Sequence, residues 1–305
     1  MPPRSVFRLK AWPTGTVAVP AYSAAFWSAP PRSVTLFATA RLPRSRVPAV
    51  TLTAPVPKAP TEAAVAEADL GKRSPMAAVE AMVAEVDTGE VVVADMAAIV
   101  TQLDAGPIAV VGHDWGSAVA YGLAILRPEL VEKLVVLNGV HPGPFQRALA
   151  AGGAQSAASQ YIDWLRADGS EEVLAAADFA KLRGLFAAHM EMGWLSGERL
   201  AAYQAEWARP GRMRGMVNWY RASPMRVAKP GEPLRDVPAP NPNRLRITCP
   251  HLLIWGTQDR ALLPEATEGL ETYAADLTRV NLPGADHWLH HQVPDAVAAT
   301  ILRFL

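Results

Sequence analysis

The sequence contains a single cysteine, Cys249, so an internal disulfide framework and a cysteine-based metal cluster are both excluded. Its place just before an apolar run predicts a small buried core residue rather than a reactive thiol. No stretch approaches the roughly 18 consecutive apolar residues that span a bilayer. Lys+Arg and Asp+Glu number 29 each, so no net charge directs the chain to nucleic acid or to a membrane surface. We therefore expect a soluble, cytoplasmic globular protein with neither as partner.

Two further absences fall in the N-terminal part of the chain. Residues 1–61 contain no Asp or Glu, and no histidine precedes His113. Proline interrupts nearly every apolar run of residues 1–89, which disfavours central strands and helix interiors. The bias persists too long for an organelle transit peptide. An off-frame reading of a GC-rich gene yields this composition, and we hypothesise that roughly residues 1–85 are translated out of frame.

From about residue 90 onward, strand patterns alternate with helix patterns, which favours an α/β fold with a parallel sheet. Residues 90–144 and 245–305 are expected to form this core, and the predominantly helical residues 145–244 a lid, or cap, over its edge. The expected strands are 108–111, 131–137, 252–255 and 279–282, and the expected core helices are 91–103, 117–126, 264–275 and 293–304.

A strand followed by Gly112-His113-Asp114-Trp115-Gly116 and a helix has the layout of a nucleophile elbow. The glycines permit a sharp turn that lifts the Asp114 side chain above the sheet, and the backbone N–H of Trp115 can stabilise an oxyanion. A carboxylate at this point is suited to displacement at saturated carbon, which gives an alkyl-enzyme ester. The structural alternative is that Asp114 only caps the helix.

Hydrolysis of such an ester requires a general base and a group that orients it. In this layout an acid and then a histidine follow the nucleophile along the chain. Asp259 and His287 each follow a predicted strand in that order, and we expect them to complete the triad. His290 and His291 are rivals that we expect to face solvent, at the start of the final helix.

Residues 90–305 resemble the epoxide hydrolases of the α/β-hydrolase superfamily, which share the Gly-His-Asp-Trp-Gly elbow of residues 112–116 and the His287-Trp288 pair. That family holds and protonates the epoxide oxygen with two tyrosines of the cap. Asn218-Trp219-Tyr220-Arg221 matches the run that carries one of them, and Tyr161 is in register with the other. Tyr203 and Tyr273 match nothing and are expected to be structural.

The resemblance implies that Asp114 opens an epoxide to a vicinal diol through an alkyl ester. Tyr161 and Tyr220 would hydrogen-bond the oxygen, and His287, oriented by Asp259, would activate the hydrolytic water. No metal or organic cofactor is required, and the Trp- and Met-rich lid favours a small apolar epoxide as substrate. The sequence leaves homodimerisation open.

The chain departs from the family at its N-terminal end. The family's His-Gly-x-Pro motif, which supplies a second oxyanion N–H, has no counterpart because no histidine precedes His113. One alternative is therefore an inactive or poorly folded product. The nearest catalytic alternative is a haloalkane or haloacid dehalogenase, which shares the Asp nucleophile and the triad. A serine esterase is disfavoured because Ser117 lies off the centre of the elbow.

Overall fold

In the computed structural model, the described residues are 10–11, 17–18, 37–39, 87–102 and 106–305. The N-terminal segment predicted to be atypical, residues 1–89, lies almost wholly outside them, so the out-of-frame hypothesis concerns residues beyond the described part of the chain. Within that segment, β1 (Lys10–Ala11) pairs antiparallel with β2 (Val17–Ala18).

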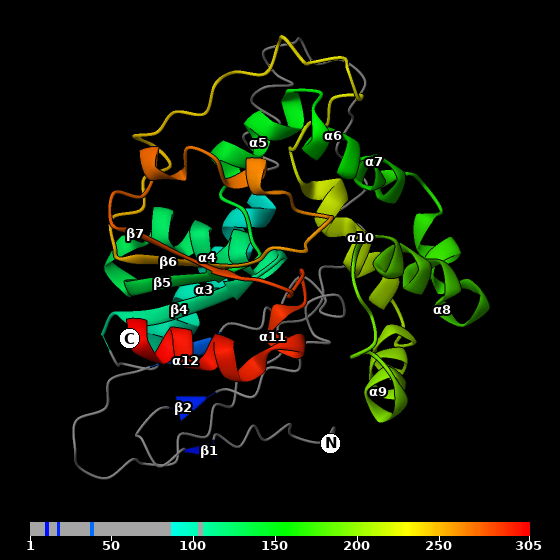
Figure 1. Cartoon of the computed structure of the whole chain (residues 1–305), viewed down its shortest axis with the longest axis horizontal. Coiled ribbons are helices and arrows are strands. Elements are labelled where there is room, and N and C mark those ends of the chain that lie inside the picture. Colours follow the sequence, from blue (N-terminus) through cyan, green and yellow to red (C-terminus); the bar gives the residue numbers. More distant parts are fainter. Residues whose placement is uncertain (1–9, 12–16, 19–36, 40–86, 103–105) are drawn as a thin grey trace, which may run out of the picture.

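The core is a five-stranded sheet in the order β3-β4-β5-β6-β7 (Figure 1). Its last four strands run parallel, and β3 joins the edge antiparallel to β4. The sheet and its covering helices confirm the predicted α/β class. The strands are β3 (Phe37–Thr39), β4 (Ile108–His113), β5 (Val131–Leu137), β6 (His251–Gly256) and β7 (Leu277–Leu282).

The two faces of the sheet carry separate apolar clusters because successive side chains of a strand point in opposite directions. One face packs against α3 (Asp87–Gln102) and α4 (Trp115–Leu126), and the other against α11 (Leu289–Gln292) and α12 (Pro294–Phe304). On β4 and β5 the first cluster takes Val110, Leu134 and Val136, whereas the second takes Val111, Val135 and Leu137.

Helices inserted between β5 and β6 gather at one end of the sheet (Figure 1). They enclose a core of their own around Leu182, Phe186 and Trp207, which are almost fully buried. The predicted helical segment ends at residue 222, and residues 223–250 return to β6 without a further helix or strand. The helices are α5 (Pro142–Ala150), α6 (Ala154–Ala158), α7 (Tyr161–Arg166), α8 (Ser170–His189), α9 (Gly197–Trp207) and α10 (Arg212–Ala222).

The single helix predicted for residues 264–275 is wrong. Two short 3₁₀ turns, η3 (Pro264–Thr267) and η4 (Leu270–Thr272), occupy this stretch. Gly269 separates them with a φ of 73°, a left-handed conformation that breaks a helix and that glycine adopts at little cost. The other predicted elements are confirmed to within a few residues. No helix in the described residues is long and apolar enough to cross a membrane.

Candidate active site

The turn between β4 and α4 holds Asp114 in an unusual backbone conformation, with φ 50° and ψ −125°. The backbone N–H and the hydroxyl of Ser117 both donate to the Asp114 carbonyl oxygen, at 2.9 and 2.5 Å, which fixes the turn. A Cβ on Gly112 would lie 2.5 Å from the Gly116 carbonyl oxygen. The turn therefore needs a glycine at position 112, as expected of a strained nucleophile elbow.

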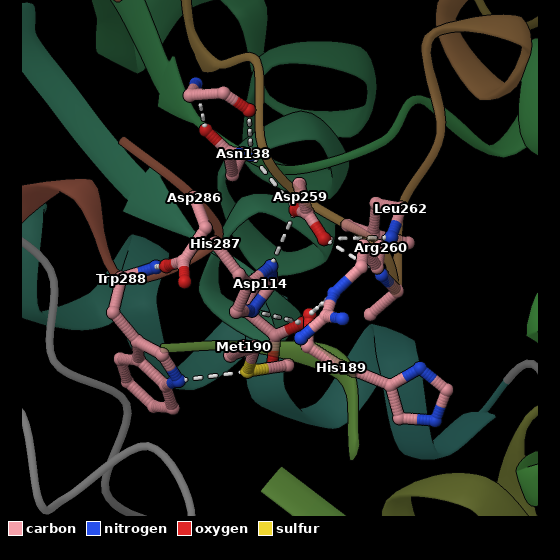
Figure 2. Close-up of polar contacts among 12 residues, drawn as sticks. Asp114, Asn138, His189, Met190, Asp259, Arg260, Leu262, Asp286, His287 and Trp288 are labelled. Atoms are coloured by element: carbon pink, nitrogen blue, oxygen red, sulfur yellow. Dashed lines mark hydrogen bonds and ion pairs between the residues drawn. The ribbon is translucent and has the colours of Figure 1, made fainter. Parts of the chain in front are cut away.

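Asp114, Asp259 and His287 follow β4, β6 and β7, so the parallel sheet brings them to one edge (Figure 2). The Nδ1 atom of His287 lies 2.9 Å from Oδ2 of Asp259, and its Nε2 lies 3.4 Å from Oδ1 of Asp114. The other oxygen of Asp259 accepts the backbone N–H groups of Ala261 and Leu262 at 2.8 and 2.9 Å. The predicted acid, histidine and nucleophile are thus hydrogen-bonded or in contact in that order.

Asn138 is a residue of this site that the sequence reasoning missed. It directly follows β5, with a φ of 31°, and is fully buried. Its amide group donates to Oδ2 of Asp259 at 2.8 Å, and its carbonyl oxygen accepts the Gly256 N–H at 2.6 Å (Figure 2). Asn138 therefore holds the acid against the end of β6, on the same oxygen that His287 contacts.

The charges of the site stabilise one another. Burial opposes ionisation of Asp114, but the hydrogen bond and charge of His287 outweigh it and hold the pKa of this carboxyl below its usual value. Burial likewise opposes the charged form of His287, yet the two carboxylates outweigh it and raise its pKa to about 10. At neutral pH the raised pKa keeps His287 as an imidazolium, beside the ionised Asp114.

One pocket is lined by Asp114, His287, Tyr161 and Tyr220 together with the apolar side chains of Leu185, Phe186, Met190, Ala261 and Leu262. The two tyrosine hydroxyls are hydrogen-bonded to each other. Burial is the main cause that raises the pKa of both. The Trp115 side chain hydrogen-bonds Tyr220 as well, and since an indole N–H only donates, the Tyr220 oxygen is the acceptor. Both tyrosines therefore line the pocket as neutral hydroxyls, and at rest one of them uses its single proton in the hydrogen bond to the other.

Oδ2 of Asp114 is buried and accepts no hydrogen bond from the residues that the structure describes. The Trp115 backbone N–H donates to the Asp114 carboxyl group. Among the described residues, no second backbone N–H donates to this carboxyl group in the way expected of the His-Gly-x-Pro motif. The free oxygen has lone pairs that no described group engages.

His113 supports the triad from the elbow itself. Its Nε2 lies 2.7 Å from the His287 carbonyl oxygen, so Nε2 carries the proton and donates. Burial, followed by the nearby charge of His287, lowers the pKa of His113 to about 3, so the ring is neutral. This contact fixes the backbone of the residue whose side chain faces Asp114.

The expectation that His290 and His291 face solvent is wrong. Both are half-buried. The His290 ring lies 4.4 Å from the His113 ring, and the His291 ring stacks on Trp194 with 4.1 Å between ring centres. The short helix α11 turns inward here because Leu289 packs into the core beneath the sheet. Neither imidazole contacts Asp114 or Asp259 in the way that His287 does.

The remaining candidates have structural contacts. Tyr203 packs in the cap core and Tyr273 in the core of the sheet, as expected. Cys249 is partly buried against the same sheet core, and burial raises its pKa to about 11. Within the described residues, no three His, Cys, Asp or Glu side chains are arranged to hold a metal ion.

Comparison with known proteins gives consistent matches. Residues 73–294 match the alpha/beta hydrolase fold family. The AB hydrolase superfamily protein YfhM of Bacillus subtilis is 30% identical over 212 residues, covering 69% of this chain and 70% of its own. Epoxide hydrolase 4 of Homo sapiens is 31% identical over 71% of this chain, and the match spans 58% of the human protein, less than two thirds of its length.

Solved structures agree with this assignment. One, described as novel epoxide hydrolases from metagenomes of hot environments, superposes with a TM-score of 0.63 at 32% identity, covering 71% of this chain and 73% of its own. A mutant epoxide hydrolase from Bacillus megaterium, in complex with a diol product, gives a TM-score of 0.61 at 27% identity, over 71% and 75% of the two chains. The family match covers well over half of the sequence. The chain therefore belongs to the α/β-hydrolase fold family.

Proposed function

We propose that this protein is an epoxide hydrolase that converts an apolar epoxide to a vicinal diol. One observation carries the proposal: a carboxylate oxygen of Asp114 without a described partner and two neutral tyrosine hydroxyls, Tyr161 and Tyr220, line the same pocket. A nucleophile and two acids are what ring opening needs, because the oxygen gains negative charge as the carbon is attacked.

In the first step, Asp114 attacks a ring carbon and the carbon–oxygen bond of the ring breaks. The oxygen takes a proton from one of the tyrosine hydroxyls, which leaves a hydroxyalkyl ester on Asp114. The hydrogen bond from the Trp115 indole to Tyr220 supports this role, because it stabilises the charge that Tyr220 bears when the proton is given up.

Ester formation also changes the charge state of His287. The Asp114 carboxylate is one of the groups that raise the pKa of His287, and its charge disappears in the ester. The pKa of His287 therefore falls, and the released proton restores the tyrosine through solvent. His287 can then act as a general base only once there is an ester to hydrolyse.

In the second step, neutral His287 takes a proton from water, and the resulting hydroxide attacks the Asp114 carbonyl carbon. Asp259 stabilises the imidazolium at Nδ1, and the Trp115 N–H stabilises the oxyanion. The ester bond breaks, and the diol oxygen takes the proton from His287. The proton left on the new Asp114 carboxyl group then passes to His287, which restores the resting carboxylate and imidazolium. Every proton that leaves one group in this sequence arrives at another.

The test is a single turnover in heavy-oxygen water with enzyme in excess over styrene oxide. Because the first diol takes its new oxygen from Asp114, it should be unlabelled, and the peptide that contains Asp114 should gain one heavy oxygen. A labelled first diol with an unlabelled Asp114 peptide would mean that water attacks the epoxide directly. That outcome would remove the ester mechanism.

A further inference from the structure

The chain segment that follows α8 lies against the loop that carries His287, and the buried carboxylate of Asp286 joins the two. Asp286 is 3% exposed. Its Oδ2 accepts the backbone N–H of Glu191 at 2.6 Å, and its Oδ1 accepts that of Trp288 at 2.8 Å. The side chain that precedes the catalytic histidine candidate therefore points away from the triad and binds the cap.

The same contact fixes one wall of the pocket. The indole N–H of Trp288 donates to the sulfur of Met190 at 2.8 Å, and Met190 lines the pocket beside Asp114 and His287 (Figure 2). Asp286 and Trp288 thus flank His287 in sequence and hold two successive residues of the cap. Any shift of residues 190 and 191 relative to this loop moves the Met190 side chain in or out of the pocket.

The pocket is narrow in this arrangement. Its cavity measures about 20 Å³, which is room for about one water molecule and for no organic epoxide. A substrate can enter only if part of the wall moves. Met190 suits this role because its side chain is unbranched and flexible, and the next residue, Glu191, is held to the loop by one hydrogen bond from its N–H to the Asp286 carboxylate.

On its side away from the pocket, Asp286 borders a second cavity of about 540 Å³, which Glu191, Arg260 and Gln292 also line. Two longer contacts supplement the carboxylate on that side: Gln292 Nε2 donates to the Glu191 carbonyl oxygen at 3.5 Å, and Arg260 Nε donates to the His189 carbonyl oxygen at 3.3 Å. Hydrogen bonds to a charged acceptor are stronger than neutral ones, so the two N–H groups are held chiefly by the carboxylate.

We propose that Asp286 is a positioning residue that latches residues 190 and 191 of the cap to the His287 loop and so limits the size of the epoxide that enters. The latch itself is a property of the fold. Its effect on substrate choice rests on the proposed function.

Hydrogen exchange tests the latch without any substrate. Asp286→Asn keeps the size of the side chain but removes its charge. The amide offers one oxygen and one NH₂ group, so the N–H of Glu191 faces either a neutral acceptor or another donor. We expect exchange in a peptide that spans residues 189–193 to quicken about tenfold or more, the loss appropriate to a hydrogen bond with a charged group. The exposed Asp276→Asn is the matched control and should exchange like the wild type. Unchanged exchange in Asp286→Asn would overturn the latch.

Substrate size gives the second readout. In Asp286→Asn, kcat/KM for stilbene oxide relative to that for butylene oxide should rise about tenfold through KM, with kcat for butylene oxide little changed. Met190→Ala removes the wall but leaves Asp286 in place, so it should shift the same ratio even if Asp286→Asn fails to fold. A ratio that neither variant moves would overturn the size limit. If no epoxide is turned over, the proposed function fails, while the exchange experiment still decides the latch.

Discussion

The Nε2 atom of His287 lies 3.4 Å from Oδ1 of Asp114, closer than a water molecule between them would allow. The histidine is therefore paired with the nucleophile at rest and cannot act as a base toward water until that charge is removed. Its pKa, raised to about 10, reflects the same pairing. In the proposed mechanism, this pairing separates the two chemical steps in time, because attack by Asp114 creates the base that completes the reaction.

The first prediction follows from that separation. His287→Gln should still form the ester, since Asp114 keeps its own oxygen and the tyrosines, but should not hydrolyse it. Intact-protein mass spectrometry after mixing with styrene oxide should show a mass increase equal to the whole epoxide, located on the Asp114 peptide. Steady-state turnover should fall by about 10³-fold or more. A variant that turns over normally, or that forms no adduct, would contradict the assignment of His287 as base.

The second prediction distinguishes an epoxide hydrolase from a dehalogenase. Tyr220→Phe removes one proton donor and should lower kcat/KM for an epoxide by about 10²-fold, the loss of one preorganised donor. A dehalogenase needs N–H donors to the halide, and the Trp115 side chain is already engaged by Tyr220. The dehalogenase would be favoured by two results together: the wild type turns over no epoxide, and the Tyr220→Phe variant still releases chloride from chlorobutane. The exposed Arg209→Gln on the same cap serves as the control.

The third prediction concerns Asn138. Asn138→Leu leaves Oδ2 of Asp259 with His287 alone and deprives the Gly256 N–H of its acceptor. We expect kcat to fall by about 10²-fold as the acid loses its fixed position. Unfolding free energy should fall by about 1–3 kcal/mol for the unpartnered backbone group. Asn138→Asp keeps an acceptor for the Gly256 N–H but sets a second carboxylate against Oδ2 of Asp259, so it should not restore kcat. Wild-type kcat in Asn138→Leu would show that Asp259 needs no such support.

The elbow, the acid and the histidine could be predicted from the sequence because each is local. Asp114 lies between glycines after an apolar run, and Asp259 and His287 each follow a strand. Asn138 could not be predicted in this way, since its partner lies 121 residues further along the chain and the contact depends on β5 and β6 being neighbours. A polar residue at the carboxyl end of a central strand was the one available signal.

Helix patterns were less informative at residues 264–275. Apolar spacing there suggested one helix, but Gly269 in a left-handed conformation divides the stretch into two turns. The inward positions of His290 and His291 likewise depend on packing with His113 and Trp194, which lie far away in sequence. Local sequence patterns were enough to predict the candidate catalytic residues. The residues that hold them in place could not be predicted, because they depend on packing between segments that are distant in sequence.

The fourth prediction is that acid destabilises the fold through histidines that are buried and neutral. Burial is the main cause of three lowered pKa values: it brings the pKa of His113 to about 3 and the pKa values of His141 and His251 to about 4. In the unfolded chain these rings take protons below about pH 6.5, so as pH falls the unfolded state binds more protons and stability drops. Each ring contributes about 1.4 kcal/mol per pH unit between its two pKa values.

His287 has the opposite sign. Its pKa is raised, so its contribution is fully present below about pH 6.5 and is lost as pH rises toward 10. We therefore expect denaturant unfolding to show a steep fall in stability from about pH 7 to about pH 5. The slope should lessen by about 1.4 kcal/mol per pH unit in His251→Gln. Equal stability at the two pH values would contradict neutral burial of these rings.

The last prediction tests the elbow itself. In Gly112→Ala the new Cβ would lie 2.5 Å from the Gly116 carbonyl oxygen and 2.8 Å from the Cα of Ser117, and both are backbone atoms that cannot swing aside. The turn must open, which moves Asp114 away from His287 and costs about 1–3 kcal/mol of unfolding free energy. Gly184→Ala is the matched control, because a Cβ there meets no atom within 4 Å. We expect Gly112→Ala to lose the ester adduct in the His287→Gln background, whereas Gly184→Ala keeps it. An adduct that forms at the same rate in both would show that the tight turn is not what aims the carboxylate.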